Sequence, residues 1–562
     1  MEKVSCDVLC LGGGGAGVTA AISAARRGAK TVLVSKEPLG YGDTRASMGM
    51  VSCPGLVDGD SEEIFYHDII RGGENLGNLE LASMMAEKCR EGCSMLENFG
   101  LLFQRDRQGC FGEKVVYPAG GHTYPRTLGC PPGGGVAIGS ALRGAVARQQ
   151  LQVFEEVAAC ALLTKEGRVV GATCYDLPSG ETLVFSAGAV ILASGGGGWL
   201  YYPHTDCSSG TTGDGFSLAL RAGAGLQDME QVQFIPFGLT HPRDRCGIFL
   251  GEPNIAAPAG LLRNSEGKVI LEGLSRMTRA AVTRVMAEEL AGGGGTEHGG
   301  LLLDLRPNLE SEKGRRIWEV RRQRGQLNIV RQAYGEEAYH WKEPWDVAPT
   351  AHYFMGGVKI DTCGRSTVEG LLAAGQVAGG IHGGNRLGSV SLAELFVFGA
   401  AAGESAAAEA GKVRHGEDIS ISAGARQSIR ELSELPGRKG RFSPLELQRR
   451  LQQVMWDKAG IARREKELQE ALELIGYLEE DSADLTIPGY KVYNREVLHA
   501  VELRHMLLVA GMIVQAALLR KESRGAHYRL DFPLRDDRNW TRNIVQHMKN
   551  GEIETHTEAV RS

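Results

Sequence analysis

The sequence has no Cys-x-x-Cys pair, although it contains 12 cysteines. Iron–sulfur clusters and structural zinc ions need thiolates at short spacing, and here Cys6 and Cys10 fall in an apolar stretch while Cys89 and Cys93 lie one helical turn apart. We therefore expect free thiols, as in a reducing cytoplasm, and no metal site.

An excess of positive charge is also missing, because the formal net charge is −6 and the isoelectric point is about 6.2. Without a basic stripe, we expect no nucleic-acid partner. The longest apolar run, residues 506–519, falls short of the roughly 20 residues that a membrane-spanning helix needs. It predicts a buried helix, and the first residues, MEKVSCDVLCL, predict a strand rather than a signal peptide, so we expect no membrane insertion.

Aromatic residues make up only 6% of the chain, whereas glycine is abundant at 77 of 562 residues. Glycine without proline- or serine-rich repeats indicates tight turns and backbone that approaches a ligand closely. With 43% hydrophobic and 23% charged residues, the composition is that of a globular protein. The length allows about three or four domains.

A strand–loop–helix–strand pattern opens the chain. Residues 4–11 predict a strand, GGGGAG (12–17) a loop, VTAAISAARRG a helix and KTVLVSK (30–36) a second strand. The loop matches Gly-x-Gly-x-x-Gly, in which the first glycine allows the turn, the second admits a pyrophosphate and the third lets helix pack on strand. The pattern predicts a dinucleotide site, although Ser35 and Lys36 stand where a ribose-binding acid is usual and Glu37 follows.

The order of predicted elements divides the chain into five segments. Residues 1–228 and 349–412 have the features of a nucleotide-binding α/β domain in two parts. Residues 229–348 mix short strands with helices, which predicts an inserted domain. Residues 417–525 predict a domain of long amphipathic helices, and residues 526–562 a polar, irregular C-terminal tail.

Four further motifs carry a family resemblance. They are GTTGDG (210–215), PTAHYFMGGV (349–358), HGGNRLGSVSLAEL (382–395) and SRGAHYRLDFPLRDDRNW (523–540). Their sequence and order resemble the flavoprotein subunit of the fumarate reductase/succinate dehydrogenase family, which also includes L-aspartate oxidase. The resemblance implies FAD as cofactor and an α/β fold with a Rossmann-like FAD-binding domain, an inserted α+β capping domain and a C-terminal helical domain.

The resemblance also implies roles for individual residues. His352 and Arg386 are similar to the pair that holds a substrate carboxylate, Arg279 to the proton-donating arginine, and Glu252 to an acid of its proton relay; for His352 and Arg279 a structural role stays open. Asp214 is either a flavin contact or a helix N-cap. The implied FAD contacts are Gly12, Gly14, Gly15, Ala16, Gly17, Ser35, Lys36, Asp43, Thr44, Gly49, Ala158, Ser194, Gly195, Asp214, His352, Gln376, Arg386, Ser389, Ser391 and Leu392.

Five positions depart from the family pattern. Asp43 replaces the histidine that carries covalent flavin, so we expect non-covalent FAD. Ile235 and Gly251 replace the histidine and threonine that bind a second carboxylate, and an isoleucine cannot repay the desolvation of a carboxylate. Ala280 replaces an acid after the catalytic arginine, and Gln376 replaces a glutamate beside FAD.

These observations predict an FAD-dependent oxidoreductase acting on CH–CH groups. We expect hydride transfer between flavin N5 and a C=C bond next to one carboxylate or carbonyl, in the direction of reduction, on a small-molecule substrate other than fumarate. The alternatives are an L-aspartate oxidase-like amino-acid oxidase and an FAD-carrying electron-transfer subunit without its own substrate chemistry. Because the chain lacks an iron–sulfur motif, we expect an iron–sulfur or other electron-transfer partner.

Overall fold

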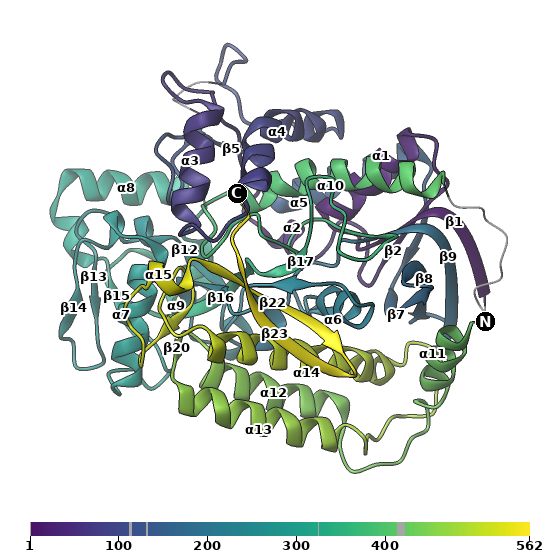
Figure 1. The fold of residues 1–562 in the computed structure, drawn as a ribbon. Coiled ribbons are helices and arrows are strands. Elements are labelled where there is room, and N and C mark those ends of the chain that lie inside the picture. Colours follow the sequence, from purple (N-terminus) through teal and green to yellow (C-terminus); the bar gives the residue numbers. More distant parts are fainter. Residues whose placement is uncertain (1, 112–114, 131–132, 324, 413–421, 562) are drawn as a thin grey trace.

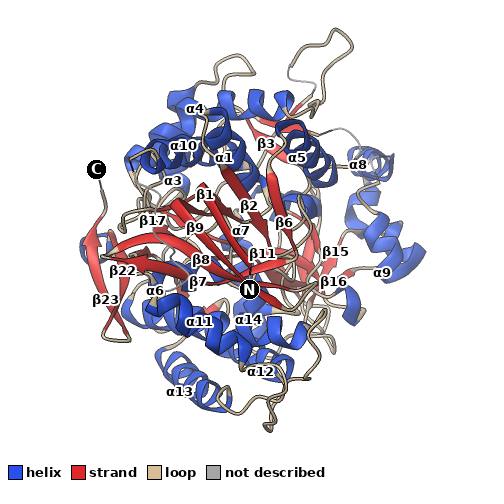
Figure 2. Ribbon diagram, turned by 90° about the vertical axis from the view of Figure 1, so that its right-hand side faces the viewer, coloured by secondary structure: helices blue, strands red, loops and turns tan. Residues whose placement is uncertain are grey.

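The computed structural model describes residues 2–111, 115–130, 133–323, 325–412 and 422–561 (Figure 1). Helices cover both sides of the largest sheet. In Figure 2, α1 (Gly15–Arg26), α4 (Leu79–Asn98) and α10 (Val390–Ala410) lie above it and the later helices below. The functional question is therefore which sheet edge the helices leave open.

The largest sheet has seven strands in the order β6-β2-β1-β9-β8-β7, with β18 paired to β9. Strands β6, β2, β1, β9 and β18 run parallel, as expected for a nucleotide-binding core, and β7 and β8 extend the sheet in antiparallel fashion. The strands are β1 (Glu2–Leu11), β2 (Thr31–Ser35), β6 (Gln152–Glu155), β7 (Val157–Lys165), β8 (Arg168–Asp176), β9 (Glu181–Leu192) and β18 (Leu371–Ala373).

Two helices from opposite ends of the nucleotide-binding segments pack closely on each other. Glycines of α10 make the approach to α1 possible, since a Cβ on Gly403 would lie 2.2 Å from the Ala20 carbonyl oxygen and one on Gly399 would lie 2.8 Å from that of Ala16. This packing brings the N-terminus of α10, with its HGGNRLGS loop, next to the N-terminus of α1. The site is built at this meeting point.

The inserted segment has its own sheet and its own hydrophobic core. Six antiparallel strands run in the order β12-β11-β16-β15-β13-β14, and buried residues from Phe237 to Val347 form a core separate from the main one. Strand β16 runs across residue 348, and the segment boundaries themselves stay predictions. The elements are β11 (Val232–Leu239), β12 (Phe249–Gly251), β13 (Leu261–Arg263), β14 (Val269–Leu271), β15 (Leu301–Asp304), β16 (Trp345–Phe354), α7 (Arg279–Ala291), α8 (Glu312–Gln323) and α9 (Asn328–Tyr339).

The prediction of an irregular tail after residue 526 is wrong. Strands β22 (Arg542–Lys549) and β23 (Glu552–Ala559) form an antiparallel hairpin that completes a sheet of order β19-β17-β10-β22-β23. Ile544 and Val545 are fully buried beneath it, whereas β23 is an edge strand with polar residues on its open side. The remaining strands are β10 (Leu226–Gln227), β17 (Gly357–Lys359) and β19 (Ala378–Gly379).

The predicted helical region begins with α11 (Ala423–Ser433) and continues with α12 (Pro444–Ala459), α13 (Glu465–Asp481) and α14 (Arg495–Leu519). Helix α14 is longer than the apolar run at 506–519 indicated, because its polar first turns begin at Arg495. By length and composition, α10 and α14 could each cross a membrane, but 61% and 78% of their apolar windows are buried inside the protein. Burial of this extent is typical of core helices.

Short elements complete the described chain. They are α2 (Asp43–Ala46), α3 (Glu62–Gly72), α5 (Gly135–Gln149), α6 (Asp214–Arg221), α15 (Asp537–Trp540), β3 (Met50–Ser52), β4 (Val116–Tyr117), β5 (Thr127–Gly129), β20 (Ala462–Arg463) and β21 (Tyr528–Arg529). Helices α2 and α6 begin at the same cavity, which is described next.

Candidate active site

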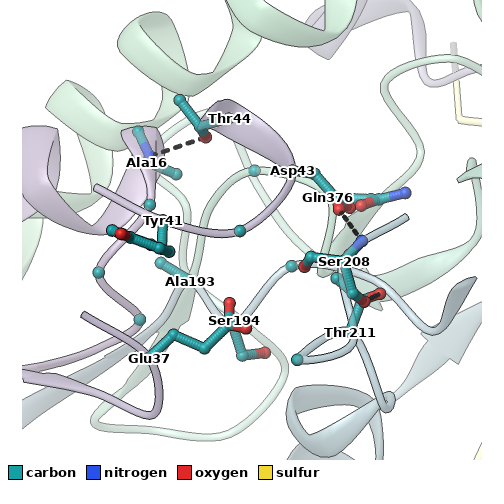
Figure 3. Close-up of a pocket in the computed structure, with 18 of the residues that line it drawn as sticks. Ala16, Glu37, Tyr41, Asp43, Thr44, Ala193, Ser194, Ser208, Thr211 and Gln376 are labelled. Atoms are coloured by element: carbon teal, nitrogen blue, oxygen red, sulfur yellow. Dashed lines mark hydrogen bonds between the residues drawn. The ribbon is translucent and has the colours of Figure 1, made fainter. Parts of the chain in front are cut away.

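A cavity opens at the carboxyl ends of β1, β2 and β9, where the loop from β1 to α1 turns (Figure 3). Gly12 has φ +132°, and a Cβ there would lie 2.1 Å from the Ala193 carbonyl oxygen. A Cβ on Gly17 would lie 1.8 Å from the Gly12 carbonyl oxygen, so this glycine lets the helix pack on the turn. These close approaches fit the roles that the sequence pattern predicts.

Most of the predicted cofactor contacts line this one cavity. The lining includes Gly12, Gly14, Gly15, Ala16, Ser35, Lys36, Asp43, Thr44, Ser194, Gly195, Asp214, His352, Gln376, Ser391 and Leu392. Gly17, Gly49, Ala158, Arg386 and Ser389 lie outside the lining. Gly49 packs against Gly134, Ala158 falls between the lining residues Val157 and Ala159, and Ser389 begins helix α10.

The cavity holds polar atoms that the protein itself does not satisfy. Ser194 Oγ, Ser208 Oγ and Gln376 Nε2 are buried without a hydrogen-bond partner in the described chain, and all three residues line the cavity. Each unsatisfied buried group costs about 1–3 kcal/mol, so a polar ligand would stabilise them. The N-terminus of α1 faces the same space and offers amides to a pyrophosphate. The residues present fit a dinucleotide such as FAD.

Lys36 does not point freely into the cavity. Its ammonium donates to Asp214 Oδ2 at 2.7 Å and to Thr212 Oγ1 at 2.7 Å, and forms an ion pair with Glu502 at 2.9 Å. Burial would lower the pKa of Lys36, but Asp214 and Glu502 outweigh it and raise the pKa above its usual range. The N-cap alternative for Asp214 is wrong, because helix α6 has Gly213 as N-cap and no side-chain cap.

Asp43 lies where covalent members of the family have histidine. Its Oδ1 accepts a hydrogen bond from the Ser208 amide at 2.7 Å (Figure 3). Burial raises the pKa of Asp43 to about 7. The cavity wall therefore presents a carboxyl group near its neutral form at this position, with no imidazole.

The predicted proton-donating arginine is held by two side chains. Arg279, at the first position of α7, forms a bidentate ion pair with Glu252, in which Nε donates to Oε2 at 2.5 Å and Nη2 to Oε1. Nη1 donates to Gln233 Oε1 at 3.0 Å. Burial alone would raise the pKa of Glu252, but Arg279, helped by His352 and Arg386, outweighs burial and lowers it.

Arg386 lies beside this pair but has no carboxylate of its own. It is 3% exposed, and its Nε donates to Gln233 Oε1 at 3.3 Å while Nη1 donates to Ser391 Oγ at 3.1 Å. Its guanidinium lies over the Tyr353 ring, 4.8 Å from the centroid. No acidic side chain of the described residues forms an ion pair with it. Burial, followed by Arg279, lowers the pKa of Arg386 to about 10, so it stays a cation at neutral pH.

His352 projects from β16 into the cavity wall. Its Nδ1 lies 2.8 Å from Asp206 Oδ2, and both residues line the cavity. A carboxylate can only accept, so Nδ1 carries the proton that is donated to Asp206, and Nε2 is left for a ligand. The structure thus links Arg279, Glu252 and Arg386 through Gln233, and places His352 on the adjoining cavity wall.

Sequence reasoning missed the residues that join these groups. Gln233 bridges the two arginines, Asp206 orients His352, and Glu502 shares Lys36 with Asp214. Gln233 stands in the same motif as Ile235, so a signal was present in the sequence. Asp206 and Glu502 have no local pattern, because only the fold brings them to their partners.

The wall expected to hold a second carboxylate is apolar. Ile235 and Phe237 on β11 are fully buried, and Phe237 pairs with Gly251 on β12. Ile235 belongs to neither of the two large hydrophobic cores, although Phe234 and Phe237 on the same strand do. Ala280 lines a small neighbouring cavity of about 20 Å³ that has no acidic side chain among its described lining residues.

Two alternative carboxylate ligands are already engaged. Arg126 is fully buried and forms ion pairs with Asp60 at 2.6 Å and Asp68 at 2.8 Å. His122 accepts from Arg126 Nη1 through Nδ1 at 3.1 Å, so its Nε2 donates to the Gly388 carbonyl at 2.7 Å. Burial lowers the pKa of His122 to about 4, which keeps it neutral.

The fold and the cavity define an FAD-binding oxidoreductase. Residues 7–392 match the FAD binding domain family and residues 448–562 match the family described as fumarate reductase flavoprotein C-term. The chain belongs to the fumarate reductase/succinate dehydrogenase flavoprotein family. Family membership confirms the predicted recognition and the cofactor, FAD.

Relatives match over the whole chain. One subunit of the fumarate reductase (CoM/CoB) of Methanothermobacter marburgensis is 35% identical over 565 residues, which are 98% of both chains. The solved structure of Mycobacterium smegmatis Sdh1 with UQ1 has a TM-score of 0.88 and 32% identity, covering 100% of this chain and 95% of that chain. Escherichia coli quinol fumarate reductase FrdA has a TM-score of 0.89 and 29% identity, covering 100% and 98%. These matches confirm the predicted fold class.

Proposed function

We propose that this protein reduces an activated C=C bond in a substrate with one carboxylate or carbonyl group beside the double bond, and that fumarate is not its preferred substrate. FAD bound in the cavity would supply hydride exchange at flavin N5. The observation that carries the proposal is Arg386, a buried cation that no described carboxylate pairs with. Such a cation is stabilised when a substrate anion binds.

The residues around Arg386 fix its orientation for this task. Gln233 accepts from both Arg386 Nε and Arg279 Nη1, which holds the two guanidinium groups in a set relation. The described hydrogen bonds of Arg386 use Nε and Nη1, which leaves Nη2 for an anion. His352, with Nδ1 bound to Asp206, offers Nε2 to the same carboxylate or carbonyl. Together they would stabilise negative charge that develops in the reaction.

Arg279 and Glu252 make a route for the proton. Arg279 is 8% exposed, whereas the side chain of Glu252 is 26% exposed and therefore reaches water. A proton given to the substrate α-carbon by Arg279 can be replaced from Glu252, which takes its own from solvent. Ala280 removes one acid of the family's relay, so Glu252 carries this function among the residues that contact Arg279.

The apolar wall supports the choice of substrate. A second carboxylate placed against Ile235 and Phe237 would lose its hydration without a compensating charge, at a cost of several kcal/mol. An apolar group at that end of the substrate would instead gain from burial. A relative is named a fumarate reductase, and its name fixes neither the substrate nor the electron donor of this chain. We further propose that electrons come from an iron–sulfur partner subunit or a soluble carrier.

Anaerobic reduction of the flavin tests this proposal. The reduced protein is mixed with mono-acid enoates, with fumarate and with buffer, and the return of the oxidised flavin spectrum is followed. Rapid reoxidation by a mono-acid enoate supports the proposal. Reoxidation by none of the compounds indicates an electron-transfer subunit, and reduction of the oxidised protein by L-aspartate indicates an amino-acid oxidase.

A further inference from the structure

Three potential metal ligands meet in the inserted segment, outside the FAD cavity. His241 follows the end of β11, Asp346 lies at the start of β16, and His298 lies in the loop before β15. Leu239 pairs with Val347, and Leu302 pairs with Asp346, so the three neighbouring strands bring these residues to one edge of the sheet. One ligand atom from each lies within 4.8 Å of the others.

Asp346 is the reason to regard this cluster as a binding site. Its residue is 7% exposed, and Oδ1 is buried without a hydrogen-bond partner in the described chain, while Oδ2 accepts from Thr296 Oγ1 at 2.7 Å. No lysine or arginine of the described residues forms an ion pair with this carboxylate. A buried carboxylate in that state is costly, and a cation bound at Oδ1 would remove the cost.

The backbone leaves room for the carboxylate at this point. A Cβ on Gly300 would lie 2.0 Å from Asp346 Oδ1 and 2.6 Å from Thr240 Cγ2. Only glycine therefore lets the loop that carries His298 lie against Asp346.

The two imidazoles are placed to complete a ligand set. The rings of His241 and His298 lie with centroids 4.0 Å apart. His241 Nδ1 lies 3.1 Å from Thr240 Oγ1, which leaves Nε2 as the atom for a metal and follows the usual arrangement, in which the other ring nitrogen is hydrogen-bonded. The His298 side chain is 41% exposed on its loop, so it can move to shorten its distance to a metal.

We propose that His241, His298 and Asp346 form a site for a divalent transition-metal ion, with zinc as the best match. Two imidazoles and one carboxylate are ligands that zinc accepts, at about 2.0–2.2 Å, and a fourth position would be taken by water or by another nearby group. The ion would fasten the loop before β15 to the ends of β11 and β16. Its role would be to stabilise the inserted segment, since zinc carries no redox chemistry.

Zinc binding by the FAD-loaded full-length protein tests the proposal. The protein is freed of metal with a chelator, and Zn²⁺ is titrated against a chromophoric competitor. Asp346→Asn and His298→Ala remove one ligand each. His340→Ala, an exposed histidine of the same segment paired with Glu336, and His556→Ala, from a second histidine cluster on the C-terminal hairpin, serve as matched controls.

The proposal predicts one tight site that is present in the wild type and in both controls. Asp346→Asn and His298→Ala should each weaken it by at least about tenfold, since even the loss of a partner behind a ligand costs 10–100-fold. Zinc should also raise the melting temperature of the wild type and not that of His298→Ala. If Asp346→Asn fails to fold, the exposed His298 decides alone. Equal zinc affinity and equal melting in the wild type and His298→Ala would overturn the proposal.

Discussion

Replacing Arg279 with alanine removes the proposed proton donor. A positioned general acid contributes about 10²–10⁴-fold to rate, which at about 1.4 kcal/mol per tenfold is roughly 3–5 kcal/mol of transition-state stabilisation. The stability cost should be smaller. Glu252 loses its bidentate partner, but its side chain is 26% exposed and regains some hydration, so we expect about 1–2 kcal/mol rather than the 3–5 kcal/mol of a fully buried pair.

The assay is oxidation of a reduced viologen with the best enoate substrate, together with the visible spectrum of bound FAD. Arg279→Ala should lose at least about 99% of kcat and keep its FAD, because Arg279 does not line the cofactor cavity. Arg276→Ala, an exposed arginine just before α7, is the matched control and should keep full activity. Residual kcat above about a tenth of wild type in Arg279→Ala would refute its role as proton donor.

Three further predictions concern the cofactor and the apolar wall. FAD should be released completely into the supernatant on acid precipitation, because Asp43 stands at the attachment position; colour retained in the pellet would contradict this. Asp43 titrates near pH 7 in the folded apoprotein, against about 4 when unfolded, so its contribution to stability is full below about pH 4 and is lost as the pH rises to about 7. Thermal melts of the apoprotein should therefore show Asp43→Asn gaining on the wild type over that range, and parallel curves would exclude the shift. Ile235→His should raise kcat/KM for fumarate relative to a mono-acid enoate by about tenfold or more, and an unchanged ratio would show that Ile235 does not select the substrate.

Local patterns were enough to predict the cofactor cavity. The turn at Gly12 and the packing of Gly17 follow from one hexapeptide, because a strand, a glycine loop and a helix are adjacent in sequence. The predicted catalytic residues His352 and Arg386 were found through long motifs. Their connection through Gln233 could not be predicted, because it depends on where β11 lies relative to the loop before α10.

Elsewhere the sequence signal was weak for physical reasons. Strand β23 reads EIETHTEA, which is polar because the strand is at a sheet edge, and its identity as a strand depends on its partner β22. The start of α14 is hidden by polar residues in its first turns. The ligands His241, His298 and Asp346 come from three separate segments, so no spacing rule for metal sites could detect them.

The central claim is that the site grips one anionic group and faces the other end of the substrate with apolar side chains. The most direct test is kcat/KM for fumarate and for a mono-acid enoate of similar size, measured with the same reduced viologen. The structure predicts a clear preference for the mono-acid, because Arg386 and His352 provide one anion site while Ile235 and Phe237 provide no donor. A tenfold or larger preference for fumarate would contradict the account.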